Sequence, residues 1–200
     1  MNMSVKVVTP TSLRERKKAE THQRIAAAAW DLFERQGYEQ TTLAQIAEAA
    51  SVSPRTLFHY FPSKEALVHP TLDEELDQLA EAFARRPHDE STFAALLAAS
   101  NEVEADAEVD LAHRQRVVAL LKQTGRTGWA YVEEAATRRI HRMVLERSEG
   151  DPDAEVRAHL AASIAGTLVA ISMERVLAHP GTDMGDELER CLGILREMTK

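Results

Sequence analysis

The sequence predicts an all-α fold of about nine helices, and three features support this class. Ala, Leu, Glu and Arg dominate the 200 residues, and these residue types favour helices. Apolar residues recur at helical spacings, and no segment shows sustained strand alternation. The seven prolines and eight glycines lie mainly at the edges of these periodic segments. With 44% hydrophobic and 28% charged residues, the chain can also bury a core.

The first helix is expected after a mobile N-terminal arm formed by residues 1–12. Apolar residues then lie on one face from residue 14 to residue 36, which predicts a helix over about this range. Gly37 follows it, and glycine adopts the positive φ that commonly ends a helix.

A helix-turn-helix arrangement is expected next. Thr42 and Gln45 have the spacing of a capping box, which predicts the start of a second short helix. Ser53 suits the N-cap of a third helix, and Pro54 suits its first position because the missing N–H has no helical partner there. The tight turn between the two helices completes the arrangement.

The third helix is expected to have an apolar side and a polar side. Leu57, Phe58 and Phe61 are predicted to pack into the core of this three-helix head, because a helix this short is unstable alone. The polar side carries Arg55, Thr56, His59 and Tyr60. A helix with such a polar side fits the major groove of DNA.

Each polar side chain suits a different part of the duplex. Arg55 is the best candidate for a guanine contact, and Thr56 suits a thymine methyl group. His59 and Tyr60 are better placed for phosphate or sugar. The first turns at Thr42 and Lys64 offer free N–H groups, which attract phosphates.

Charge is distributed unevenly along the chain. The net charge is −8, yet residues 1–70 contain nine Lys/Arg and seven Asp/Glu, against fifteen and twenty-five in residues 71–200. An acidic body with a basic N-terminal region suggests that only this region meets a polyanion, although a solvated tail is the alternative. The basic side chains expected to hold phosphates are Arg14, Arg16, Lys17 and Lys18. Such contacts supply affinity rather than sequence choice.

The remainder of the chain is expected to be helical. Ser63 is expected to cap a fourth helix that runs to about Arg86, where Pro87 interrupts it. Breaks at "TGRTG", "GDPD" and "HPGTD" separate the later helices. These helices are expected near residues 90–104, 109–123, 128–148, 153–178 and 184–198.

Several classes of protein receive no support. The one cysteine, Cys191, forms no internal disulfide and fits a reducing compartment. The stretch "LAASIAGTLVAISMERVLA" is interrupted by Glu174 and Arg175, so a buried soluble helix is favoured over a membrane span. We therefore expect a cytoplasmic protein. No catalytic constellation, metal-ligand spacing or cofactor motif is found, so no enzyme activity, metal or cofactor is expected.

The segment "RIAAAAWDLFERQGYEQTTLAQIAEAASVSPRTLFHYFPSKEALV" resembles the DNA-binding head of the tetracycline-repressor (TetR) family of bacterial regulators. The resemblance implies a homodimer of Ω-shaped, all-helical subunits, with a DNA-binding domain at residues 1–66 and an effector and dimerisation domain at residues 67–200. It places base readers between Ser51 and His59. Pro54 departs from the polar or small residue of many relatives, so no base contact is expected from it. The full set of expected DNA contacts is Arg14, Arg16, Lys17, Lys18, Thr41, Thr42, Ser51, Ser53, Arg55, Thr56, His59, Tyr60 and Lys64.

The dimer implied by this resemblance needs an interface. A stripe of small residues, four apart, and an apolar face of the last helix are the candidates. In order, these residues are Ala158, Ala162, Gly166, Ala170, Leu188, Cys191, Leu192 and Leu195. The alternative is that both helices pack inside one subunit.

Candidate effector contacts are the large apolar side chains of the body, each of which is alternatively a simple core residue. They are Phe93, Leu97, Val117, Leu121, Trp129, Val132, Met143 and Met173. A mainly aliphatic interior favours an apolar or amphipathic effector. The basic side chains Lys122, Arg126, Arg138, Arg139 and Arg142 could instead meet an anionic ligand such as an acyl thioester, or simply form a solvated helix face.

The sequence predicts a one-component transcriptional regulator, and a repressor is the expected kind. A dimer would bind a pseudo-palindromic DNA operator and be released by a small molecule. An architectural DNA-binding protein without an effector is the alternative. A helical enzyme is a further alternative, for which no residue is a candidate.

Overall fold

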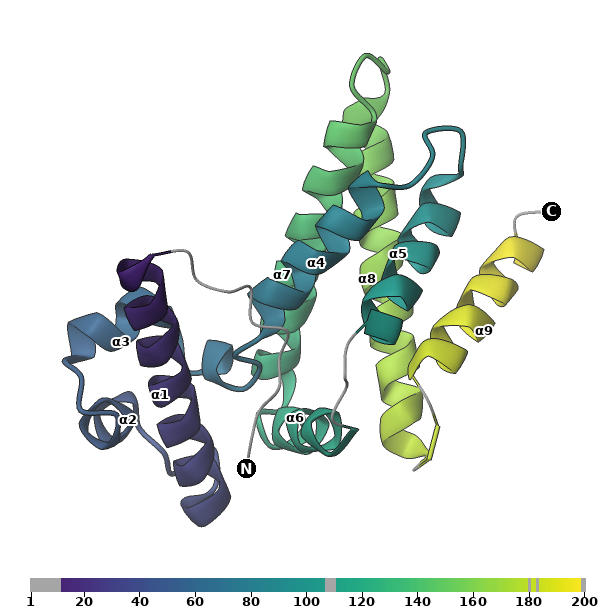
Figure 1. The fold of residues 1–200 in the computed structure, drawn as a ribbon. Helices are drawn as coiled ribbons and strands as arrows, with labels where there is room; N and C mark the ends of the chain where they lie inside the picture. The colour runs from purple at the N-terminus through teal and green to yellow at the C-terminus, as the bar shows by residue number, and fades with distance from the viewer. Residues whose placement is uncertain (1–11, 107–110, 180, 183, 199–200) are drawn as a thin grey trace. The chain divides into compact units, whose positions relative to one another are not determined.

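The computed structural model describes residues 12–106, 111–179, 181–182 and 184–198, and its regular structure there is entirely helical (Figure 1). The helices are α1 (Leu13–Gln36), α2 (Leu43–Ala49), α3 (Pro54–Tyr60), the short 3₁₀ helix η1 (Glu65–Leu67), α4 (Leu72–Ala84), α5 (Thr92–Asp106), α6 (Leu111–Gln123), α7 (Arg126–Arg147), α8 (Ala154–Ala178) and α9 (Met184–Met198). The all-α prediction is confirmed. The predicted arm lies outside the described residues apart from Ser12.

The chain divides into two compact units. The first contains the described residues up to Thr71 together with α6 and the start of α7, up to Tyr131. The second contains α4, α5, the rest of α7, α8 and α9.

Apolar side chains of α1, α2, α3 and η1 form the core of the head in the first unit. Ile25, Ile46, Leu57 and Leu67 are fully buried. The indole Nε1 of Trp30 donates a buried hydrogen bond of 3.0 Å to the carbonyl oxygen of Leu67. This bond joins α1 to η1, so the segment after α3 is fixed against α1.

Local capping explains where the three helices of the head begin. Ser12 and Glu15 form a capping box at the start of α1, and Thr42 and Gln45 form the predicted one at the start of α2. Ser53 accepts a hydrogen bond from the N–H of Thr56 at the start of α3. The predicted starts of α2 and α3 are therefore confirmed.

The turn between α2 and α3 places a serine in a glycine-like conformation. Ser51 has φ of 52°. The N–H of Ser51 donates to the Glu48 carbonyl, and the N–H of Val52 donates to the Ala47 carbonyl, both at 2.9 Å. This pair of bonds is a Schellman motif, which usually has glycine at the left-handed position. The Arg24 side chain also donates to the Ala50 carbonyl at 2.9 Å and holds the turn against α1.

Replacing Ser51 by Gly is expected to raise the free energy of unfolding by about 0.5–1 kcal/mol, because glycine adopts positive φ without strain. The matched variant Ser53→Ala, two residues along, should lower it by about 1 kcal/mol because it removes the N-cap. Urea denaturation followed by circular dichroism measures both. Destabilisation by Ser51→Gly would show that the turn needs the serine side chain.

The predicted fourth helix, from Ser63 to about Arg86, is wrong at its start. The chain forms the short η1, and α4 begins only at Leu72. Pro70 accounts for the difference, because proline lacks an N–H and disfavours helical backbone in the residue before it. The Ser63 hydroxyl accepts a hydrogen bond from the Ala66 N–H at 3.4 Å, so it caps the short turn instead.

Four helices of the second unit share one core, which contains Ala82 and Phe83 of α4, residues of α5, Ile140, Met143 and Val144 of α7, and Ala158, Ala161 and Ala162 of α8. A smaller cluster joins Leu168 of α8 to Cys191 and Leu192 of α9.

By length and composition alone, Ala154–Val176 of α8 is apolar enough to cross a membrane. In the structure, however, one side of this helix packs in the core of its own subunit.

The small-residue stripe predicted for a dimer interface is largely turned inward. Ala158 and Ala162 are buried in the core of their own subunit. A Cβ at Gly166 would lie 3.0 Å from the Thr137 hydroxyl of α7, so this glycine permits a close approach within the subunit. Cys191 and Leu192 are likewise buried against α8. Among the residues of the stripe only Ala170 is exposed, so the prediction of this stripe as an interface is corrected.

Candidate nucleic-acid interface

Helix α3 has a narrow buried side and a wide exposed side. Leu57 and Phe61 are buried, and Phe61 is only 2% exposed. Phe58 is 51% exposed, so its predicted place in the core is wrong. At about 100° per residue, Leu57 and Phe61 lie on one side of a helix and Phe58 points away from Leu57. We call Arg55, Phe58 and His59 the exposed arc of α3, since all three are exposed and adjacent on the helix surface.

The half-buried flank of α3 is fixed by local contacts. The Thr56 hydroxyl lies 2.8 Å from the Ser53 hydroxyl, which also accepts from the Thr56 N–H. The Tyr60 ring lies 5.4 Å from the His59 ring and 6.4 Å from the His22 ring of α1. These contacts hold α3 in one orientation.

Thr41 and Thr42 were both expected to contact DNA, but the structure separates them. Thr42 is exposed at the start of α2, where its N–H and hydroxyl join the capping box with Gln45. Thr41 is 1% exposed, and its hydroxyl donates a 2.8 Å hydrogen bond to the Gly37 carbonyl. The Thr41 side chain is therefore used inside the head, and we remove it from the set of expected contacts.

Lys64, in the same unit, lies against the aromatic ring of Tyr38. Its Nζ is 4.0 Å from the centre of the Tyr38 ring, a cation–π contact. The Tyr38 hydroxyl donates to a Glu65 carboxylate oxygen at 3.2 Å. Burial and the Glu65 charge raise the pKa of Tyr38, so the phenol remains a donor at neutral pH. No local sequence pattern marks this contact.

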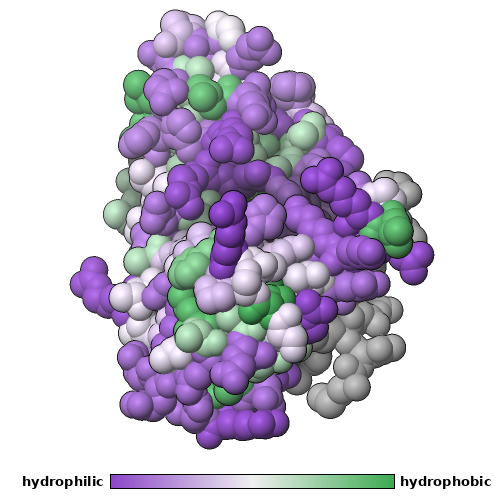
Figure 2. Space-filling view, turned by 90° about the vertical axis from the view of Figure 1, so that its left-hand side faces the viewer, coloured by the Kyte–Doolittle hydropathy of each residue, from purple (hydrophilic) through white to green (hydrophobic). Residues whose placement is uncertain are grey.

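The N-terminal part of α1 carries exposed cations on several of its sides. The side chains of Arg14, Arg16, Lys17 and Lys18 are exposed, as expected. On the face shown in Figure 2, hydrophobic residues form several separate patches among hydrophilic residues, one of them in the lower centre of the view. Between Ser51 and Lys64 the chain contains no acidic residue. The arrangement suits a polyanion with some apolar groups on its surface.

The candidate effector contacts are distributed over separate cores. Val117 and Leu121 are buried in the first unit, which also contains Trp129. Met143 is buried in the main core of the second unit, and Phe93 and Leu97 pack against the cluster of α8 and α9. Val132 and Met173 are half-buried.

Two open surface hollows of about 270 and 310 Å³ are lined by other residues, including Arg147 and Leu160. Two of the candidate cations for an anionic ligand already have acidic partners, since Arg138 pairs with Glu134 and Arg139 pairs with Asp77.

Comparison with known proteins agrees with this geometry. The family model described as "Bacterial regulatory proteins, tetR family" matches residues 25–70. The regulator TcmR of Streptomyces glaucescens is 30% identical over 160 residues, which cover 76% of this chain and 71% of TcmR. The chain belongs to the TetR family. Its helix-turn-helix head is therefore a DNA-binding domain, and the protein is a transcriptional regulator rather than an enzyme. TetR-family regulators bind DNA and small-molecule effectors, typically as dimers.

Other known proteins match over part of the chain or in fold. RutR of Escherichia coli K12 is 43% identical over 75 residues, which cover 38% of this chain and 35% of RutR. The structure of Thermus thermophilus FadR, a repressor in complex with lauroyl-CoA, is 25% identical with a TM-score of 0.53, covering 88% of this chain and 93% of FadR. NalD, a repressor of a multidrug efflux pump in Pseudomonas aeruginosa, is 20% identical with a TM-score of 0.54, covering 91% of this chain and 96% of NalD, and shares the fold.

Proposed function

We propose that the protein is a dimeric repressor that binds a pseudo-palindromic operator with two copies of α3 in successive major grooves. The observation that carries the proposal is the exposed arc of α3, which is held outward by the buried Leu57 and Phe61. The domain at residues 1–66 would bind DNA, and residues 67–200 would bind the effector and the second subunit.

The proposed contacts follow the exposure of the side chains. Arg55 reads a guanine, because its guanidinium can donate two hydrogen bonds to the guanine edge. His59 and Tyr60 contact phosphate or sugar. Further phosphate contacts come from exposed or partly exposed residues: Arg14, Arg16, Lys17, Lys18, Thr42, Ser51, Ser53 and Lys64. Thr56 reaches the duplex only from the flank of α3.

The dimer interface is proposed on the outer side of α8 and α9, in place of the small-residue stripe. The large exposed hydrophobic side chains of these helices are Val156, Leu160, Ile171, Ile194 and Met198. Five such side chains on two packed helices favour association with the same face of a second copy. Ala170, Leu188 and Leu195 lie on the same two helices and remain candidates for its rim.

The effector is proposed to be small and apolar or amphipathic. The described core of the second unit is formed by alanine, leucine, isoleucine, valine, methionine and phenylalanine side chains, and a pocket opening among them would suit such a molecule. FadR, which has the same fold, is a repressor bound to an acyl thioester. An effector that releases the protein from DNA must prefer the unbound conformation, and the operator must weaken effector binding by the same factor.

Two alanine variants test the reading role of α3. Arg55→Ala is expected to weaken operator binding by about 10–100-fold while changing the affinity for random DNA little, because a base contact is lost. Lys64→Ala should weaken binding to both DNAs alike and reduce the salt dependence by about one ion, because a phosphate contact is lost. Fluorescence anisotropy at several salt concentrations measures both. Equal losses on the two DNAs for Arg55→Ala would remove it from the reading role.

A further inference from the structure

The exposed arc of α3 carries an aromatic ring that the core of the protein does not use. Phe58 is 51% exposed, and among the large exposed hydrophobic side chains of the described residues it is the aromatic one. About half of the ring surface is left in water, so a binding partner that covers it gains a hydrophobic contribution. Phe58 lies on the surface that DNA is proposed to cover, so DNA binding could bury the ring.

The neighbours of Phe58 identify the partner. Arg55 and His59 lie beside it on the arc, and Lys64 and the cations of α1 belong to the same unit. With no acidic residue from Ser51 to Lys64, an anionic duplex fits this surface better than an apolar protein face does.

A phenyl ring restricts what can be contacted on DNA. It has no hydroxyl or N–H, so it hydrogen-bonds neither a phosphate nor a base edge. The apolar group that base edges present in the major groove is the 5-methyl group of thymine. Thr56, the residue first expected to meet that methyl, is half-buried with its hydroxyl against Ser53.

We propose that Phe58 reads thymine, by covering a 5-methyl group in the major groove beside the base contacted by Arg55. The inference rests on the proposed function, because it requires α3 to enter the major groove. It adds a second reader of different chemistry to the arc: Arg55 recognises hydrogen-bond acceptors, and Phe58 recognises a methyl group.

Replacing thymine by uracil in the operator tests the inference, because only the methyl group is removed. The wild-type protein first selects its preferred sequence from a random duplex library. Each thymine of that sequence is then replaced by deoxyuridine. We expect one position in each half-site at which wild-type affinity falls about fourfold, the value for one buried methyl group.

Protein variants assign the methyl effect to a residue. Phe58→Ala should bind the thymine and uracil operators equally, and Phe58→Leu should keep part of the preference. Arg55→Ala is the matched control from the same arc, and it should keep the thymine preference while losing the guanine preference. Because Phe58 is exposed, Phe58→Ala should retain the wild-type thermal midpoint, which circular dichroism checks.

Three results would contradict the proposal, and each identifies a different failure. A wild-type protein that selects a sequence but binds its uracil form equally overturns the reading of thymine alone. So does a thymine preference that persists in Phe58→Ala, since another residue then covers the methyl group. A wild-type protein that selects no sequence overturns the proposed function together with this inference.

Discussion

Leu160→Glu is expected to convert the protein to a monomer and to abolish tight operator binding. Leu160 is 58% exposed on α8, so the subunit does not need it for folding. In the proposed interface, its replacement would bury an unpaired charge, which costs on the order of 3 kcal/mol. Because the interface has two-fold symmetry, both subunits bury the charge and the cost is incurred twice. A monomer engages only one half-site, and the contribution of the second α3 is lost.

Size-exclusion chromatography with light scattering measures the first effect, and anisotropy with the operator measures the second. Ala119→Glu is the matched control, because it introduces the same side chain at an exposed position of α6. The control should remain dimeric. A Leu160→Glu variant that is as dimeric as the control would show that the outer side of α8 and α9 is not the interface.

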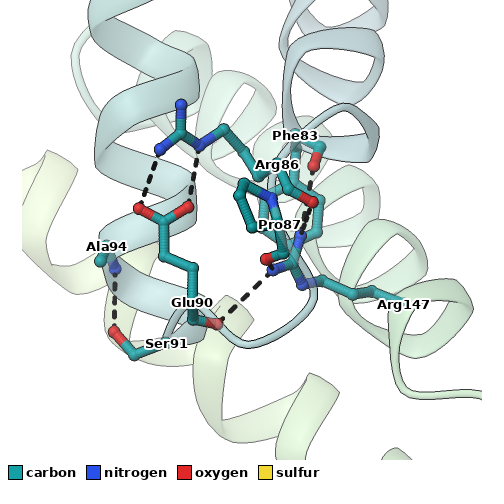
Figure 3. A network of polar contacts seen from close by, with 7 residues as sticks. All are labelled: Phe83, Arg86, Pro87, Glu90, Ser91, Ala94 and Arg147. Carbon is teal, nitrogen blue, oxygen red and sulfur yellow. Dashed lines mark hydrogen bonds and ion pairs between the residues drawn. The ribbon is translucent and has the colours of Figure 1, made fainter.

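Arg147→Met is expected to lower the free energy of unfolding by about 2–3 kcal/mol, because a charged donor to several carbonyl oxygens is lost. The guanidinium of Arg147, at the end of α7, reaches the connection between α4 and α5 (Figure 3). It donates to the carbonyl oxygens of Phe83, Arg86, Pro87 and Glu90. Its charge also lies 4.9 Å from the centre of the Phe83 ring.

The control for Arg147 lies on the same helix. Arg138 forms one exposed pair with Glu134, four residues away, and Arg138→Met should cost no more than about 0.5 kcal/mol. Arg147→Lys should lose most of what Arg147→Met loses, because an ammonium group cannot reproduce the planar set of donors. Urea denaturation compares the three variants. Equal effects at positions 147 and 138 would show that the network does not stabilise the second unit.

The parts of the fold that depend on local chemistry could be predicted from the sequence. Thr42 with Gln45, and Ser53 with Pro54, satisfy free N–H groups within a few residues of themselves. The helix starts they mark are therefore independent of distant contacts. Ser63 predicts a helix start because it can act as an N-cap, but Pro70 interrupts helical backbone, so α4 begins only at Leu72.

The orientation of side chains was harder to predict. The hydrophobicity of Phe58 predicts a core position, whereas the angle of about 100° per residue turns it away from Leu57 and the side chain is exposed. Ala158 and Ala162 do form a close-packed stripe, as expected. Periodicity alone does not say whether such a stripe meets the same subunit or a second copy, and here it meets the same subunit.

The effector contacts could not be predicted for a related reason. An apolar side chain has the same sequence signal in a core and in a pocket, as Met143 and Leu121 illustrate. The contact between Lys64 and Tyr38 joins residues far apart in the sequence, and no local pattern marks it.

Dimethyl sulfate footprinting on the selected DNA sequence tests most directly whether two copies of α3 enter the major groove together, because this reagent methylates guanine N7, which faces that groove. We expect two protected half-sites related by two-fold symmetry, with centres a whole number of helical turns apart, about 10 base pairs per turn. Protection should be lost with Arg55→Ala at physiological salt. A single asymmetric footprint, or uniform protection along any DNA, would contradict the account.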